Sequence, residues 1–333
     1  MPVLPEPGSP DAETFEAHRD LMFAVAYRML GTVTDAEDAV QDAWLRWSAA
    51  PRADVTDPRA YLTKVITNTS LNKLRAVRAR REAYIGPWLP EPLLTSINPD
   101  IPVRIEVAES VSLAMLVVLE SLTPEERAVF VLREVFAFSY AEIGSALGRT
   151  EVSARQLAHR AREHVQARRP RFPVDRGQEQ EVTQRFLDAA AGGDINGLIA
   201  VLAPDVTLTS DGGGKARAAL RQVMGSAKVA RLLHGIVTRP QSGVDLSSLV
   251  LEMAEINGRP GLLFLSPSGS GADPGGGAGP GGGPGLGGGP GLGGGSAMGA
   301  MTWDISGDWV TGVQIIVNPD KLAALSARRT LPL

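Results

Sequence analysis

The sequence has no cysteine and only four histidines among its 333 residues. Without thiolates, neither a disulfide framework nor a cysteine-ligated metal site can form, and scattered histidines do not predict a zinc cluster. No apolar run approaches the roughly 20 residues that a membrane-spanning helix needs. The N-terminal stretch is acidic and proline-rich, unlike the basic start and apolar core of a secretory signal. We therefore expect a cytoplasmic protein with no metal, no other cofactor and no membrane partner.

The charged residues that are present are strongly segregated, although the formal net charge is only −4. Residues 1–45 contain nine acidic residues against two arginines. Residues 57–82 and residues 149–171 each contain seven basic residues against two acidic ones. Two separate basic segments predict two contacts with a polyanion such as DNA. For either segment taken alone, the alternative is a solvated helix face.

Residues 11–82 have apolar side chains at helical spacing and are predicted to form one domain of consecutive helices. A capping box, Thr34 to Glu37, predicts the start of the second helix, and Asp57 followed by proline predicts the start of the third. Residues 83–108 contain five prolines and are predicted to be a linker. The apolar residues of this linker leave two interpretations open, a loop pinned to its nearest domain and a docking segment.

Residues 109–170 are predicted to form a second helical domain. Capping boxes begin at Thr123 and Ser139, Gly148 ends a short helix, and Thr150 begins a basic one. Two helices joined by a tight glycine-containing turn, the second of them basic, are typical of a DNA-binding helix-turn-helix. An ordinary helical hairpin is the alternative.

Residues 176–330 change in character and predict an α+β domain, in which a helix precedes several alternating segments typical of strands. A glycine-rich insertion at 267–297 is too poor in apolar side chains to form a core, so we expect a flexible loop within this domain. The segment DGGGK at 211–215 predicts a tight turn. It is shaped either for protein contact or for binding an anion through its backbone N–H groups.

Several of these segments resemble the extracytoplasmic-function sigma factors of bacterial RNA polymerase. Residues 35–47 (DAEDAVQDAWLRW) resemble region 2.2 of that family, residues 57–81 resemble regions 2.3 and 2.4, and residues 122–163 resemble region 4. The motifs WLPEP at 88–92, DGGGK, and NPDKL at 318–322 resemble a subgroup with a SnoaL-like C-terminal extension. The implied fold is multidomain: two all-α sigma domains, a region 2 bundle and a region 4 helix-turn-helix, followed by an α+β SnoaL-like cone related to nuclear transport factor 2.

The resemblance implies a sigma factor that binds core RNA polymerase at its clamp helices and flap region and directs promoter-specific initiation. The residues that would bind polymerase are acidic or amide residues of one helix: Asp35, Glu37, Asp38, Gln41 and Asp42. Amide groups can read base edges and cations can hold phosphates. The residues that would contact the −10 element are Lys64, Asn68, Asn72, Arg75 and Arg78. The residues that would contact the −35 element are Arg149, Glu151, Ser153, Arg155, Gln156, His159 and Arg160.

The resemblance also implies that the C-terminal domain is an intramolecular regulator, not an enzyme, that docks on the linker and the DNA-binding domains. The residues expected at this contact are Trp88, Leu89, Pro90, Asp211, Lys215, Asn318, Asp320 and Lys321. One alternative is a helix-turn-helix regulator with a ligand-sensing domain. Another is a DNA-tethered SnoaL-type isomerase or cyclase, which would need an acid or base. The available acid–base groups are Asp205, Asp211, His234, Glu252 and Asp304.

Overall fold

The computed structural model describes residues 10–50, 55–81, 83–96, 112–167, 176–238, 249–267 and 295–327. Its first part is a three-helix unit made of α1 (Pro10–Leu30), α2 (Val33–Ala49) and α3 (Pro58–Arg81). The start of α2 differs from the prediction, because Thr32 and not Thr34 is the N-cap and accepts a hydrogen bond from the backbone of Asp35. Gly31 ends α1 in the left-handed region (φ +77°), which leaves Thr32 extended and in position to cap.

The second helical unit contains α5 (Leu113–Glu120), α6 (Pro124–Phe130), a π-helical turn (Val131–Val135), α7 (Tyr140–Leu147) and α8 (Glu151–Gln166). Both predicted capping boxes form, because Thr123 and Ser139 each exchange hydrogen bonds with the glutamate three residues later. Gly148 closes α7 with a left-handed φ of +63°, and Thr150 caps α8. The pair α7–α8 is therefore the helix-turn-helix that the sequence predicts.

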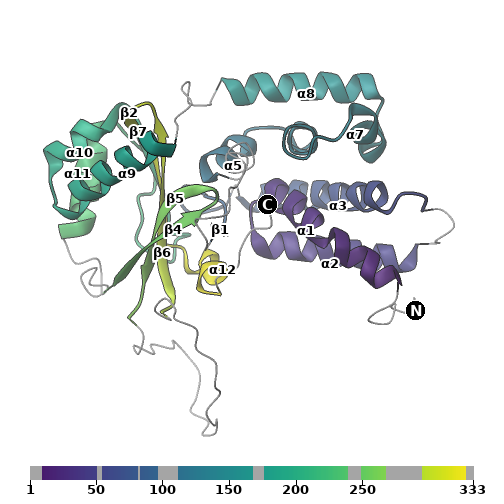
Figure 1. The fold of residues 1–333 in the computed structure, drawn as a ribbon, viewed down its shortest axis with the longest axis horizontal. Coiled ribbons are helices and arrows are strands. Elements are labelled where there is room, and N and C mark those ends of the chain that lie inside the picture. The colour runs from purple at the N-terminus through teal and green to yellow at the C-terminus, as the bar shows by residue number, and fades with distance from the viewer. Residues whose placement is uncertain are drawn as a thin grey trace, which may run out of the picture.

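The C-terminal part is a seven-stranded sheet covered on one face by α9 (Arg176–Ala191), α10 (Ile195–Val201) and α11 (Ser226–Thr238) (Figure 1). Its strand order is β1-β4-β5-β6-β7-β2-β3, antiparallel except between β2 and β7. The strands are β1 (Leu94–Ser96), β2 (Leu202–Asp211), β3 (Val223–Met224), β4 (Val250–Ile256), β5 (Arg259–Leu265), β6 (Ala297–Ser306) and β7 (Trp309–Ile316). A 3-10 turn (Pro319–Lys321) and α12 (Ala323–Ser326) follow.

The predicted glycine-rich insertion falls between β5 and β6, and its residues 268–294 lie outside the described residues. The two strands that flank it pair with each other, with Leu262 opposite Met301. The insertion therefore joins two neighbouring strands of one sheet.

The segment between the helical units is more than a connection, because β1 belongs to the sheet of the C-terminal part. Leu94 pairs with Ile256 at the sheet edge. Leu89, Leu94 and Leu113 of α5 are buried in a cluster on the sheet face opposite α9–α11. One face of the sheet thus packs against its own helices, and the other packs against the linker and the second helical unit.

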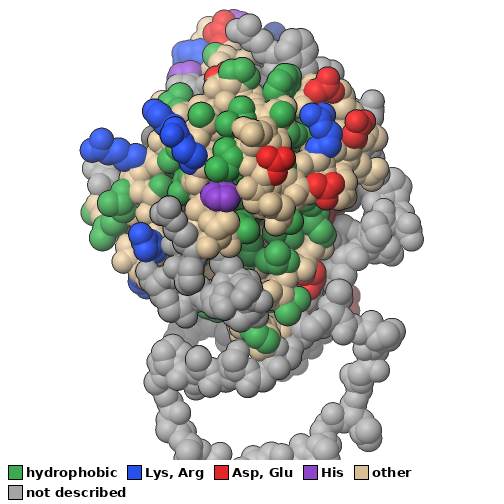
Figure 2. All heavy atoms as spheres, turned by 90° about the vertical axis from the view of Figure 1, so that its left-hand side faces the viewer, with side chains coloured by type: hydrophobic (Ala, Val, Ile, Leu, Met, Phe, Trp, Pro, Cys, Tyr) green, Lys and Arg blue, Asp and Glu red, His purple; other side chains and the backbone are tan. Residues whose placement is uncertain are grey.

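The two helical units also pack on each other, and their apolar side chains form one continuous cluster that includes Ile66, Leu74, Val129 and Ile143. Helix α3 contacts both α6 and α7. Seen from the side of α9–α11, the C-terminal part presents Lys and Arg side chains mostly at the left and Asp and Glu side chains mostly at the right, with apolar side chains between them (Figure 2).

Candidate functional site

The predicted polymerase-binding residues lie on α2, away from its buried Ala36, Val40 and Ala43. Several of them already have partners within the three-helix unit. The carboxylate of Glu37 is 2.8 Å from the guanidinium of Arg19 on α1. The ammonium of Lys73 on α3 lies 3.7 Å from Asp38 and 3.4 Å from Asp42. Asp35 accepts a hydrogen bond from the hydroxyl of its N-cap Thr32 at 2.6 Å, and Gln41 is exposed.

The surface ion pairs on α2 are of the exposed kind that contributes about 0–1 kcal/mol. Asp38 and Asp42 keep roughly half of their side-chain surface in solvent. A basic partner can therefore replace Lys73 at little cost. The acidic face is geometrically available, although the chain partly neutralises it.

The predicted −10 residues lie along α3, where the second helical unit covers part of the helix. The amide of Asn68 donates to the carbonyl of Ala146 in α7 at 2.9 Å. The guanidinium of Arg75 is 2.6 Å from Glu125 of α6, and this contact lowers the pKa of Glu125 although partial burial opposes it. Lys64 and Asn72 are exposed. Arg78 also lies in α3, but its side chain is outside the described part of the chain.

The predicted −35 residues occupy the turn before α8 and its exposed face. Arg155 pairs with Glu151 at 2.8 Å and lies over the ring of Tyr140, 5.4 Å from its centroid. Arg160 lies 3.4 Å from Glu126 of α6, and His159 lies 3.6 Å from Glu163. The structure places all seven in one region, and those exposed to solvent are Arg149, Glu151, Arg155, Gln156, His159 and Arg160.

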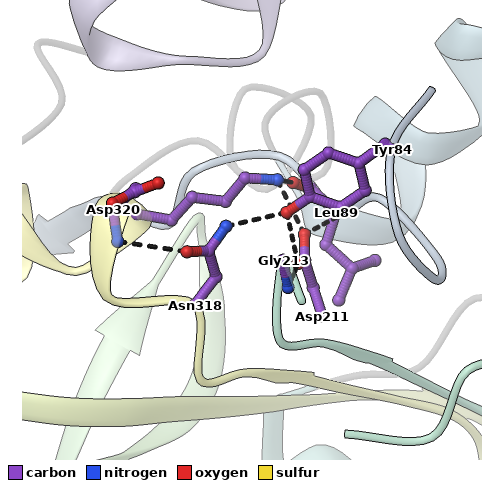
Figure 3. A network of polar contacts seen from close by, with 7 residues as sticks. Tyr84, Leu89, Asp211, Gly213, Asn318 and Asp320 are labelled. Carbon is purple, nitrogen blue, oxygen red and sulfur yellow. Dashed lines mark hydrogen bonds and ion pairs between the residues drawn. The ribbon is translucent and has the colours of Figure 1, made fainter. Parts of the chain in front are cut away.

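The predicted interdomain residues converge on a buried contact that we call the Asp211 junction, made of Tyr84, Leu89, Asp211, Asn318 and Lys321 (Figure 3). Asp211 stands at the end of β2 and is fully buried. One carboxylate oxygen accepts the backbone N–H of Leu89 at 2.8 Å and the ammonium of Lys321 at 2.7 Å. The other accepts the hydroxyl of Tyr84 at 2.6 Å. Lys321 also donates to the carbonyl of Leu89, so both backbone groups of this linker residue are bound.

The glycines of the DGGGK segment let the chain turn tightly against the Asp211 junction. Gly213 has a φ of +59° and donates its backbone N–H to Asp211 at 3.1 Å. A Cβ on Gly213 would lie 2.3 Å from the amide nitrogen of Asn318. Lys215 pairs with Asp320 at 2.6 Å on the surface. Of the two predicted uses of this turn, the geometry favours protein contact, since the turn and its lysine engage other parts of the same chain.

The remaining predicted linker residues flank the junction. Trp88 lies over the ammonium of Lys321, 4.3 Å from the ring centroid, and Pro90 is buried. Trp88 also packs on Gly31, where a Cβ would lie 2.7 Å from the indole. The linker is therefore held between the C-terminal part and the turn that joins α1 to α2.

Tyr84 belongs to the Asp211 junction but is not among the predicted site residues. Its hydroxyl bridges Asp211 and Asn318, with Asn318 donating at 2.7 Å. Burial and the neighbouring carboxylate raise the pKa of Tyr84, so the phenol is neutral and donates to Asp211. No local pattern marks it, because both partners are more than 100 residues away.

The candidate acid–base groups of the isomerase alternative have different surroundings and partners. Asp211 is bound in the junction, and Asp205 is exposed. His234 contacts the carbonyl of Gly193 at 3.0 Å, whereas Asp304 accepts a hydrogen bond from Gln314 at 2.7 Å. Among the described residues no group of three or more histidine, aspartate or glutamate side chains could hold a metal ion. No helix in the same ranges is long and apolar enough to cross a membrane.

Comparison with known proteins identifies both helical units. The family model for Sigma-70 region 2 matches residues 14–81, and the model for Sigma-70 region 4 matches residues 112–165. The chain is 44% identical over 253 residues to the ECF RNA polymerase sigma factor SigJ of Mycobacterium tuberculosis, covering 75% of this chain and 80% of that protein. It is 32% identical over 224 residues to SigG of the same species, covering 58% and 60%.

The solved structure of Mycobacterium tuberculosis SigJ is similar along almost the whole chain, with a TM-score of 0.68 and 37% identity. The match covers 94% of this chain and 98% of that one. Two helical units that match the Sigma-70 region 2 and region 4 models, followed by an α+β domain, define a class of transcription initiation factors. The chain belongs to the extracytoplasmic-function sigma factors of bacterial RNA polymerase. The predicted fold class, two helical sigma domains and a C-terminal α+β domain, is confirmed.

Proposed function

We propose that this sigma factor binds core polymerase with α2, contacts the −10 element with α3 and the −35 element with α8, and is regulated by docking of its own C-terminal domain. The polymerase contact uses the acidic face of Asp35, Glu37, Asp38, Gln41 and Asp42. We place this activity in the cytoplasm and assign no catalysis to the C-terminal domain. The family relationship supports these assignments, and the surfaces described above support the assigned polymerase and DNA contacts.

The described arrangement is a closed form that cannot hold both promoter elements at once. Asn68 of the −10 helix is bonded to Ala146, five residues before the first residue of the recognition helix. The recognition helix has 16 residues, or about 24 Å. The two elements are named for positions about 25 base pairs apart, which is roughly 85 Å at about 3.4 Å per base pair. The two helical units must therefore separate before both elements are bound.

The Asp211 junction supports the regulatory part of the proposal more than any other observation. It places a buried lysine and a buried aspartate of the C-terminal domain on the backbone of Leu89, in the segment that joins the two DNA-binding units. While the linker is held there, its freedom to let the units separate is reduced. Releasing the junction should favour the open form and increase transcription.

Run-off transcription with purified core polymerase and genomic promoter fragments tests the proposal on the full chain. We expect specific initiation by the wild type, and at least a severalfold increase in output for Lys321→Met. The matched control is Lys228→Met, which removes an exposed lysine of α11 far from the linker. Asn72→Ala and Gln156→Ala should lower output, because each removes an amide assigned to base contact.

Two results would contradict the proposal. Specific DNA binding without any initiation would identify an ordinary helix-turn-helix regulator. Equal output from the wild type and Lys321→Met would show that docking at Asp211 does not regulate transcription.

A further inference from the structure

A second junction joins the C-terminal domain to region 2, at the turn between β4 and β5. The turn residues Asn257 and Gly258 both have positive φ, +51° and +71°. An Asn-Gly pair is typical of a two-residue hairpin turn. Such turns normally lie at the surface, yet Asn257 is fully buried. The turn is therefore covered by other parts of the chain.

Asn257 contacts the linker as a strand residue would, although it lies in a turn. Its backbone N–H donates to the carbonyl of Leu93 at 2.8 Å, and its side-chain oxygen accepts the N–H of Leu93 at 2.9 Å. Its side-chain nitrogen donates to the hydroxyl of Tyr27 in α1 at 2.8 Å. One asparagine thus binds both the linker and region 2.

The hydrogen bonds continue from Tyr27 to the first residue of α2. The hydroxyl of Tyr27, itself fully buried, donates to the carbonyl of Glu91 at 2.6 Å. Glu91 donates its N–H to the carbonyl of Gly31 at 2.8 Å, and its carboxylate accepts the N–H of Val33 at 2.7 Å. Val33 begins α2, and a carboxylate at a helix N-terminus is favourably placed.

We infer that Asn257 is a positioning residue through which the C-terminal domain holds the N-terminal end of α2. The inference rests on the proposed function in one respect, namely that α2 carries the polymerase-binding face. The path runs from Asn257 through Tyr27 and Glu91 to Val33 and involves buried groups, so the loss of one bond leaves a polar partner unsatisfied. This path shares no residue with the Asp211 junction.

The physical effect is preorganisation of the polymerase-binding helix. A helix end that is already fixed loses less conformational freedom when a partner binds. Loosening the β4–β5 turn from Tyr27 should therefore increase motion at the start of α2 and weaken binding of core polymerase. A coupling between distant sites typically changes an affinity by about fivefold or more.

Two conservative variants of the full-length protein test the inference. Asn257→Asp keeps the size and the tolerance of positive φ, but offers no N–H to Tyr27. Tyr27→Phe keeps the stacking on Phe23 and removes only the hydroxyl. Asn196→Asp is the matched control, because it makes the same chemical change at an exposed position of α10. The readouts are amide hydrogen exchange at Val33–Ala36 and affinity for core polymerase, both measured well below the melting temperature.

We expect faster exchange at the start of α2 and about fivefold or more weaker polymerase binding for both junction variants. The effects should not add in the double variant, because both substitutions break the same path. Wild-type exchange and affinity in either variant, even with a lowered melting temperature, would reduce Asn257 to a structural role and overturn the inference. If the wild type itself does not bind polymerase, the proposed function fails, and hydrogen exchange alone then decides the inference.

Discussion

Asp211 has no solvent-exposed surface, yet it accepts four hydrogen bonds: from Leu89, Lys321, Tyr84 and Gly213. Burying a carboxylate costs several kcal/mol, and only a complete set of donors offsets that cost. Removing one partner of a buried pair typically costs about 3–5 kcal/mol. Effects of Lys321 substitutions on transcription must therefore be compared at temperatures where both proteins are folded.

A second carboxylate, the partly buried Asp304 on β6, makes stability depend on pH. Burial raises its pKa, against the hydrogen bond from Gln314 and the charge of Arg259. The folded state therefore binds the proton more tightly than the unfolded state does. This tighter binding of the proton stabilises the fold. The stabilisation is fully present below the pKa of an unfolded aspartate, about 3.9, and is lost as the pH rises through the pKa of Asp304 in the folded state.

Asp304→Asn should raise the melting temperature at pH 7, because the amide can still accept from Gln314 and carries no buried charge. The gain should shrink as the pH falls through the raised pKa of the wild-type carboxyl, because protonation removes its charge in the folded protein. Melting curves between pH 4 and 8 measure this difference. Asp308→Asn, at an exposed position of the following turn, should show no such trend. A less stable Asp304→Asn at pH 7 would show that the carboxylate is needed in charged form.

At the scale of the element, local signals could be predicted from the sequence and distant contacts could not. The caps at Thr123, Ser139 and Thr150 were predictable, because each cap bonds a residue three positions away. The predicted cap at Thr34 is wrong. The segment contains two candidate N-caps, Thr32 and Thr34, and Thr32 is the cap because Gly31 ends α1 directly before it. Strand β1 could not be predicted, because its partner Ile256 lies far along the chain.

The turn formed by residues 211–215 gives a test at this scale. Gly213→Ala should destabilise the protein by more than Gly307→Ala, although both glycines have nearly the same φ, +59° and +57°. Left-handed backbone costs a residue with Cβ about 1–2 kcal/mol at either position. Only at Gly213 does the added Cβ also collide with Asn318, whereas Gly307 has open space.

Urea unfolding followed by tryptophan fluorescence would measure the two losses, and run-off transcription would show whether the turn affects output. We expect altered transcription for Gly213→Ala alone, because displacing Asn318 loosens Tyr84. Equal losses for both variants would mean that the turn contributes only its own backbone conformation.

At the scale of the whole molecule, the two basic segments were predicted to make two separate contacts with DNA. The sequence could not show that the two helical units carrying these segments pack on each other, since the contact of Asn68 with Ala146 joins residues 78 positions apart. Leu89, Asp211, Asn318 and Lys321 of the Asp211 junction were predicted from motif resemblance. Tyr84 and Asn257 were missed, because no motif contains them.

The closed arrangement predicts a large change in distance on promoter binding. The chain has no cysteine, so spin labels can be attached only where cysteines are introduced. Ala76→Cys on α3 combined with Ser145→Cys on α7 gives a distance across two helices that contact each other in the free protein. With core polymerase and promoter DNA, the distance should lengthen by about 20 Å or more. The distance between labels at Ala76→Cys and Arg46→Cys, both within region 2, should stay constant. An unchanged distance for the first pair would show that the units do not separate.

The edge strand β1 also bears on how the protein is made. Leu93 and its partner Asn257 are 164 residues apart. At about 5–20 residues per second, a ribosome needs roughly 8 to 33 s to add that length of chain. During that interval both sigma domains have been synthesised while the linker still lacks its partners in the C-terminal part. The nascent chain thus passes through a stage with exposed apolar leucines and no attached regulator, when a chaperone or polymerase can reach it first.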